Sequence, residues 1–197
     1  MQNPRANHRR SVRIIAGQWR GRRLAIPRGT AVRPTPDRVR ETVFNWLTDT
    51  VVGATCLDLF AGTGALGLEA LSRGAREVWL VEQDAVLSQA LRSIVKELDA
   101  GNAQIIKSDA RALLGKPPGQ SFDLAFLDPP YAEPLEPLLA QLDPWLADSA
   151  CIYVERPYGP DSPEPLDELA AALPGSSLVK QSRAAAVAFG LLRFQRS

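Results

Sequence analysis

The sequence predicts an α/β fold built on a seven-stranded, mostly parallel sheet with one antiparallel strand, preceded by an N-terminal hairpin-and-helix extension. From residue 55 onward, short apolar runs of strand length alternate with segments whose apolar residues recur at helical spacing. Such repeated strand–helix units favour a parallel sheet with helices on both faces. Two apolar runs near the C-terminus predict a hairpin, which would supply the antiparallel strand.

A chain of 197 residues is long enough for one domain with a modest appendage. We expect a disordered basic tail at residues 1–11, the extension at 12–50 and the main α/β domain at 51–197. No internal repeat divides the main domain further, and we expect a compact monomer.

The extension begins with two short apolar runs, 12–16 and 22–26, joined by a glycine-flanked turn that predicts a hairpin. A stiff, proline-rich stretch follows. Thr35 is the expected N-cap of a helix that has Pro36 at its first position and continues to about Thr48.

The main domain is expected to contain five strands and several helices before its final hairpin. Apolar positions recur at helical spacing, and Gly74 is suited to end the first helix of the domain. We expect strands at 55–60, 77–82, 103–107, 122–127 and 151–155, helices at 65–73, 85–98, 110–114, 135–145 and 166–173, and hairpin strands at 177–181 and 185–194.

The net charge of +1 conceals an uneven distribution. Residues 1–40 contain eleven arginines and one acid, a balance of +10, whereas the rest of the chain carries −9. A basic segment on an acidic body indicates a polyanionic partner, with nucleic acid as the first candidate, although a solvated tail has the same composition. We predict phosphate contacts for Arg20, Arg22, Arg33 and Arg38, and packing against the domain for Trp19.

Composition narrows the class of protein further. No apolar run approaches the roughly 20 residues of a membrane span, and the basic N-terminus lacks the apolar segment of a signal peptide. Cys56 and Cys151 lie in predicted central strands, where buried reduced thiols fit a cytoplasmic protein. With one histidine and no Cys/His cluster, the sequence does not support a zinc site.

A glycine-rich turn follows the first strand of the main domain. Gly62, Gly64 and Gly67 match G-x-G-x-x-G, and Glu82 ends the next strand 20 residues after Gly62, as in a dinucleotide site. Asp58, however, precedes the turn and would repel a pyrophosphate. S-adenosylmethionine suits these acids better, because it carries an ammonium, a sulfonium and ribose hydroxyls.

The cofactor site is expected to include the ends of three successive strands. Asp109 either caps the following helix or accepts from the exocyclic amine of an adenine, and both roles stay open. The expected cofactor-binding residues are Asp58, Phe60, Ala61, Gly62, Thr63, Gly64, Glu82, Gln83, Ser108, Asp109 and Ala110.

The catalytic candidates are Asp128, Pro129, Pro130 and Tyr131, which follow the fourth strand of the main domain. The prolines fix two φ angles and remove two N–H donors, so the Asp128 carboxylate and the Pro129 carbonyl are left as acceptors on a stiff turn. Such a corner can hold a planar group that carries an amine, with the Tyr131 ring stacked on it. A rigid turn without chemistry is the alternative interpretation.

The order of Asp58-x-x-x-Gly62-x-Gly64, Glu82, Ser108-Asp109 and Asp128-Pro129-Pro130-Tyr131 resembles the Rossmann-like class I S-adenosylmethionine-dependent methyltransferases. Three further stretches, 13–22, 33–47 and 68–74, resemble the RsmD family of bacterial 16S ribosomal RNA guanine-N2 methyltransferases. The resemblance covers roughly residues 11 to 196. It implies methylation of a guanine in the small ribosomal subunit or its assembly intermediate.

Three alternatives remain at this stage. Other RNA enzymes that methylate amino groups share the motif. An adenine-N6 methyltransferase of nucleic acids uses a similar corner, usually with Asn at the position of Asp128. A non-catalytic RNA-binding assembly factor that retains the cofactor fold would have no need of an intact Asp128–Tyr131 motif.

Overall fold

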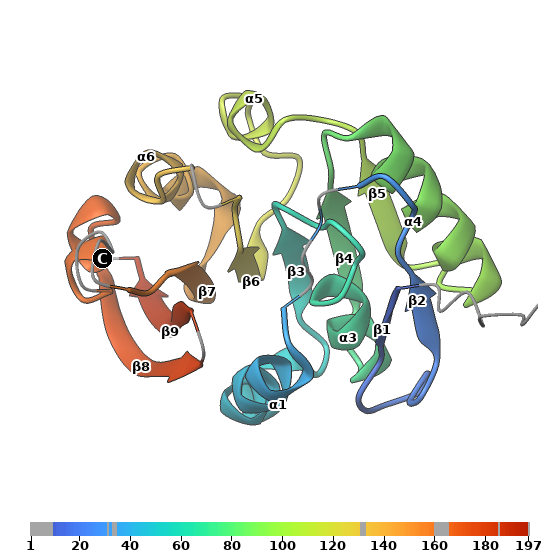
Figure 1. Cartoon of the computed structure of the whole chain (residues 1–197). Coiled ribbons are helices and arrows are strands. Elements are labelled where there is room, and N and C mark those ends of the chain that lie inside the picture. The colour runs from blue at the N-terminus through green and yellow to red at the C-terminus, as the bar shows by residue number, and fades with distance from the viewer. Residues whose placement is uncertain are drawn as a thin grey trace, which may run out of the picture.

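The computed structural model describes residues 10–30, 32, 35–130, 133–159, 166–184 and 186–196. Its main sheet has the strand order β5-β4-β3-β6-β7-β9-β8 (Figure 1). Neighbouring strands from β5 to β7 are parallel, and β9 runs antiparallel to both β7 and β8. The predicted seven-stranded, mostly parallel sheet with one antiparallel strand is therefore confirmed. The strands are β3 (Thr55–Asp58), β4 (Glu77–Val81), β5 (Ala103–Ile106), β6 (Phe122–Leu127), β7 (Leu146–Pro157), β8 (Ser176–Ala184) and β9 (Val187–Gln195).

Helices cover both faces of this sheet, and Figure 1 shows α5 and α6 on the side opposite α1 and α3. The predicted helix at 135–145 is divided into two pieces, because Pro144 has no N–H to bond to the carbonyl four residues earlier. The helical segments of the main domain are α3 (Gly67–Ser72), α4 (Ala85–Glu97), α5 (Ala110–Leu114), α6 (Glu136–Leu139) and the 3₁₀ turns η1 (Asp143–Trp145) and η2 (Glu168–Ala172).

The extension consists of a hairpin, β1 (Ser11–Arg13) and β2 (Arg23–Ala25), and two helices, α1 (Asp37–Trp46) and α2 (Thr48–Val51). The hairpin is confirmed, and it includes Ser11 from the end of the predicted tail; residues 1–9 lie outside the described residues. The helix of the extension begins at Asp37, and no side chain caps it. The prediction of Thr35 as its N-cap was wrong, because the Thr35 hydroxyl donates to a carboxylate across the chain instead.

The extension is joined to the main domain through buried polar contacts on α3. The carboxylate of Glu69, which is fully buried, accepts from the backbone N–H groups of Ile15 and Ala16 at 2.7 and 3.0 Å. It also pairs with Arg40 and Arg73. These contacts satisfy a buried charge that would otherwise be very costly, so they tie the hairpin and α1 to α3.

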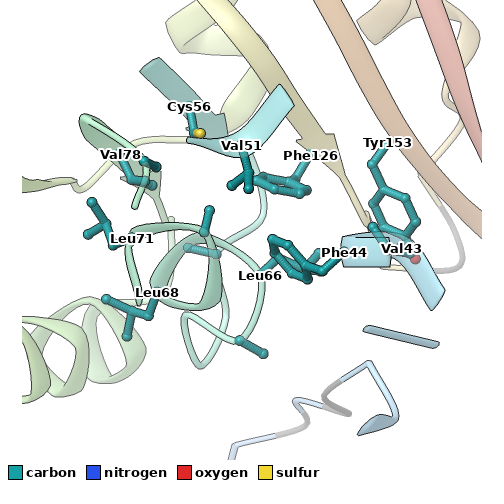
Figure 2. Close-up of a cluster of buried hydrophobic side chains, with 14 of the residues drawn as sticks. Val43, Phe44, Val51, Cys56, Leu66, Leu68, Leu71, Val78, Phe126 and Tyr153 are labelled. Carbon is teal, nitrogen blue, oxygen red and sulfur yellow. The ribbon is translucent and has the colours of Figure 1, made fainter. Parts of the chain in front are cut away.

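Apolar side chains of α1 complete the core beneath β6 and β7. The ring centroids of Phe44 and Phe126 are 6.0 Å apart, and those of Phe126 and Tyr153 are 6.3 Å apart. All three side chains are labelled in Figure 2. Trp19 is only 9% exposed, which confirms its predicted packing role. Phe126 lies one residue before the end of β6 and pairs with Tyr153 of β7, two residues before Glu155, so this aromatic layer supports the edge of the sheet that carries the site.

Gly17 sits where the hairpin turn meets α3. Its φ is +80°, and a Cβ there would collide with the backbone of Ser72. We expect Gly17→Ala to lower the free energy of unfolding by roughly 3–5 kcal/mol, from backbone strain together with steric displacement. The matched control is Gly21→Ala, where φ is +83° but nothing lies within 4 Å of the new methyl group.

The Gly21→Ala variant should lose only about 1–2 kcal/mol from backbone strain. Urea unfolding of both variants measures the difference. Equal losses would show that the contact between the hairpin turn and α3 is not rigid.

Cys56 and Cys151 are buried free thiols, as predicted. Among the described helices none has the length and apolar character to cross a membrane. Among the residues that the structure describes, no group of three or more His, Cys, Asp or Glu side chains is placed to hold a metal ion.

Candidate active site

A cavity of about 1170 Å³ lies at the carboxyl ends of β3, β4, β6 and β7. In open α/β sheets this edge is the usual position of a ligand site, because the strand ends and the loops that follow them converge there. The cavity wall includes Asp58, Glu82, Asp109, Asp128 and Glu155. Residues 28–30 of the extension contribute to the same wall, so the extension and the main domain share one site.

The glycine-rich turn allows close approach of the backbone to this cavity. Gly62 has a φ of +54° and lies in the wall, as do Ala61 and Thr63. Gly64 has a φ of +80°, and a Cβ there would lie 2.7 Å from Leu68 and 2.9 Å from Leu91, which are core residues. Gly64 thus lets the turn pack closely against the core, whereas Gly62 exposes its backbone to a ligand in the cavity.

Asp58 ends β3 and is only 1% exposed. Its Oδ2 accepts from the backbone N–H of Gly67 at 3.0 Å, which fixes the start of α3. Burial raises the pKa of Asp58 from 3.8 to about 7, and the nearby acids Asp128 and Glu82 contribute in the same direction, while the Gly67 N–H lowers it. A buried acid in this state favours a cationic ligand.

Glu82, at the end of β4, joins two loops of the site. Its Oε2 accepts from the N–H of Gly62 at 2.9 Å and its Oε1 from that of Asp84 at 2.7 Å. The carboxylate therefore already holds the glycine turn against the loop before α4. Each oxygen retains a second lone pair for a ribose hydroxyl.

Asp109 follows β5 and caps α5. Its Oδ1 accepts from the N–H of Ala112 at 3.0 Å, which confirms the capping role. Asp109 also lines the cavity, together with Ser108 and Ala110, so its role toward an adenine amine stays a prediction. Gln83 and Phe60 line the cavity as well.

Asp128 follows β6, with Pro129 and Pro130 beside it in the cavity wall. The Thr35 hydroxyl donates to Asp128 Oδ2 at 2.9 Å. Burial raises the pKa of Asp128 from 3.8 to about 6, and the Thr35 hydrogen bond opposes this rise. The fourth catalytic candidate, Tyr131, lies outside the described residues.

Glu155 is a site residue that we did not predict from the sequence. It ends the apolar part of β7, and because Leu127 pairs with Val154, the next residues Asp128 and Glu155 are neighbours at the sheet edge. The Tyr153 hydroxyl donates to Glu155 Oε2 at 2.6 Å. Burial and then the Asp128 charge raise the pKa of Glu155 to about 8, against the Tyr153 hydrogen bond.

The pattern that identified Asp58 and Asp128 is also present at Glu155, because an acid follows the apolar run 151–154. Because Asp128 and Glu155 lie side by side and the pKa of each is raised, the two acids are expected to titrate as a pair.

The arginines of the extension divide into two groups. Arg20 and Arg38 are exposed, and Arg22 is exposed but pairs with Glu97 at 2.7 Å. Arg40, by contrast, is fully buried and serves the fold. Arg33 lies outside the described residues. Of the predicted phosphate contacts, Arg20 and Arg38 have the least competition from protein groups.

Known proteins resemble this chain across both the extension and the main domain. The model of the family described as "Conserved hypothetical protein 95" matches residues 12–175. The ribosomal RNA small subunit methyltransferase D of Escherichia coli K12 is 48% identical over 158 residues, which are 79% of this chain and 79% of that protein. The protein of the same name from Haemophilus influenzae is 43% identical over 156 residues, covering 76% of this chain and 80% of that one.

Among solved structures, the Escherichia coli protein yhhF superposes with a TM-score of 0.82 at 43% identity, covering 95% of this chain and 99% of that one. The match thus includes the extension as well as the sheet and its site. The chain belongs to the family of ribosomal RNA small subunit methyltransferase D.

Proposed function

We propose that this protein is an S-adenosylmethionine-dependent methyltransferase that modifies the exocyclic N2 amine of a guanine in 16S ribosomal RNA. The small subunit or its assembly intermediate is the proposed partner, and the cytoplasm the proposed location. The observation that carries the proposal is the half-buried Asp128 carboxylate, which shares one cavity with the glycine turn and the acid Asp58. Membership of the family supports the choice of ribosomal RNA.

The residues present fit S-adenosylmethionine. The cavity is large enough for a nucleoside with an amino acid side arm, and Gly62 lets the backbone approach it. Asp58, with its raised pKa, suits an ammonium, and Glu82 suits ribose hydroxyls. A pyrophosphate would instead face three acids, Asp58, Glu82 and Asp128, against one cation in the described wall, Arg28 of the extension. The cofactor would supply an electrophilic methyl group on a sulfonium.

Asp128 and the Pro129 carbonyl would accept the two N–H bonds of the guanine amine. This amine is a poor nucleophile because its lone pair is delocalised into the ring, so orientation and proton acceptance are what the protein must add. Positioning of this kind can contribute roughly 7–11 kcal/mol. Tyr131 would stack on the base, which must be looped or flipped out to reach the cavity.

The exposed arginines of the extension give a prediction for RNA binding. We expect Arg20→Ala and Arg38→Ala each to reduce the slope of log K against log salt by about 0.7–0.9, because each removes one phosphate contact. The matched control is Arg196→Ala. Arg196 pairs with Asp143 and Asp148 at the N-terminal end of β7, which is the end away from the cavity. Binding titrations at several salt concentrations measure the slopes, and a slope unchanged by the extension variants would assign these arginines to another role.

The proposed function is tested by supplying labelled S-adenosylmethionine with undermethylated small subunits, naked 16S RNA or DNA. We expect label in the RNA as N2-methylguanosine by nucleoside analysis. Labelled N6-methyladenosine would replace the proposal with the adenine-N6 alternative. Specific binding to the subunit with no label in any substrate would favour a non-catalytic assembly factor.

A further inference from the structure

The hydroxyl of Thr35 and the carboxylate of Asp128 are separated by 93 positions in the chain, yet they are in direct contact. Thr35 is 4% exposed, and its Oγ1 donates to Asp128 Oδ2 at 2.9 Å. Thr35 stands immediately before Pro36 and α1, where its ordinary role would be to cap the helix. It makes no such cap, so its hydroxyl is committed to the carboxylate.

A buried arginine fixes the position of Thr35. The Nε of Arg40 donates to the Thr35 carbonyl at 3.2 Å, and its Nη2 donates to the Arg13 carbonyl at 2.8 Å and to Asp37 Oδ1 at 2.7 Å. Arg40 also pairs with Glu69, which holds the hairpin backbone. The hairpin, α1 and α3 therefore converge on the residue that contacts Asp128.

We propose that Thr35 is a positioning residue that fixes the Asp128 carboxylate for methyl transfer and couples it to the seating of the N-terminal extension. By occupying Oδ2, the hydroxyl limits rotation of the carboxylate and leaves Oδ1 for the target amine. A donor on one oxygen also favours the ionised form, which is the form able to accept from N–H groups. This inference rests on the proposed function, since it concerns the same carboxylate.

The acids around Asp128 make the effect of the Thr35 hydroxyl measurable as a change in the pKa of Asp128. The Asp128 charge raises the pKa values of Asp58 and Glu155, and burial raises the pKa of Asp128 itself against the Thr35 hydrogen bond. Tyr153 commits its hydroxyl to Glu155. In the part of the chain that the structure describes, Thr35 is the side chain shown donating to Asp128. Its removal should therefore raise the pKa of Asp128.

The test compares three variants. Thr35→Val keeps the shape but removes the hydroxyl, Thr35→Ser keeps the hydroxyl, and Thr42→Val removes an exposed hydroxyl of α1 that bonds only to the Arg38 carbonyl. We expect Thr35→Val to lower kcat roughly 10- to 100-fold, as loss of a hydrogen bond to a charged group would. The acid limb of its pH–rate profile should move to higher pH, with KM for RNA nearly unchanged.

Thr35→Ser should restore most of kcat and the original pH profile, and Thr42→Val should match the wild type. Equal impairment of the Val and Ser variants, or a Thr35→Val enzyme with normal kcat and profile, would overturn the inference. A direct titration of Asp128 by carboxyl ¹³C NMR, in wild type and Thr35→Val, gives a readout independent of turnover. An unshifted Asp128 titration overturns the inference, whereas a wild type that methylates no nucleic acid refutes the proposed function.

Discussion

Replacing Asp128 by alanine is expected to abolish detectable methyl transfer while leaving affinity for S-adenosylmethionine nearly intact. The variant removes the acceptor that orients the amine and can take its proton, and a positioned acid or base typically contributes about 10²- to 10⁴-fold in rate. The fold should survive, because the raised pKa of Asp128 shows that its charged form is costly where it lies. Single-turnover assays, calorimetric cofactor binding and melting curves measure the three quantities.

Asp128→Asn separates the two roles of the carboxylate. The amide keeps an oxygen that can accept an N–H bond, but it cannot take a proton. A rate between those of the wild type and alanine would assign the main role to orientation, and a rate as low as that of alanine would assign it to proton acceptance. Turnover retained in the alanine variant would contradict the mechanism.

The wild-type pH profile provides a check on the same group. With the pKa of Asp128 at about 6, the reactive ionised form is lost as pH falls through 6, so the rate should fall there. The limb should be absent from the residual activity of Asp128→Asn. Because the Asp128 charge raises the pKa of the neighbouring Glu155, the two acids titrate as a pair and the acid limb reports their joint behaviour.

The strand–helix order and the strand-end acids could be predicted from the sequence, because periodicity and position along a strand are local properties. Asp58 and Asp128 were found because each ends an apolar run, and parallel strands bring such ends together. The capping role of Asp109 could also be predicted, because a helix cap depends only on the residues next to the helix start.

Long-range polar pairing could not be predicted in this way. The local sequence at Thr35 indicates a helix cap, but the carboxylate that accepts its hydrogen bond belongs to Asp128, 93 residues away. Arg40 belongs to a basic segment that suggested RNA contacts, yet it is buried against Glu69 of α3. In both cases a buried or half-buried charge, whose partner only the tertiary fold supplies, decided the role of the residue.

Asp58→Asn is expected to raise stability at alkaline pH and, at the same time, to weaken cofactor binding. Asp58 has a pKa of about 7 in the folded protein against an ordinary value of 3.8. Its contribution to stability is therefore complete below about pH 3.8 and is lost as pH rises through 7, because the folded state holds a proton that the unfolded chain releases. At pH 8 the wild type must keep a buried, ionised carboxylate that the amide variant lacks.

We expect the gain in unfolding free energy at pH 8 to be on the order of 1–4 kcal/mol, and the wild-type fall in stability between pH 5 and 8 to become shallower. The amide oxygen can still accept from the Gly67 N–H, so the turn should keep its form. Affinity for S-adenosylmethionine should fall roughly 10- to 100-fold, as for loss of a hydrogen bond between charged groups. Denaturant titrations across pH and calorimetry measure these two effects.

The matched control is Asp123→Asn, at the other end of the same pair of strands. Asp123 Oδ2 accepts from the Thr55 N–H at 2.8 Å, as Asp58 accepts from Gly67, but Asp123 does not line the cavity. Its substitution should leave cofactor affinity unchanged. If Asp58→Asn gained stability without losing cofactor affinity, Asp58 would be only a structural clamp for the glycine turn, and the cationic part of the ligand would have to meet Glu82 or Asp128 instead.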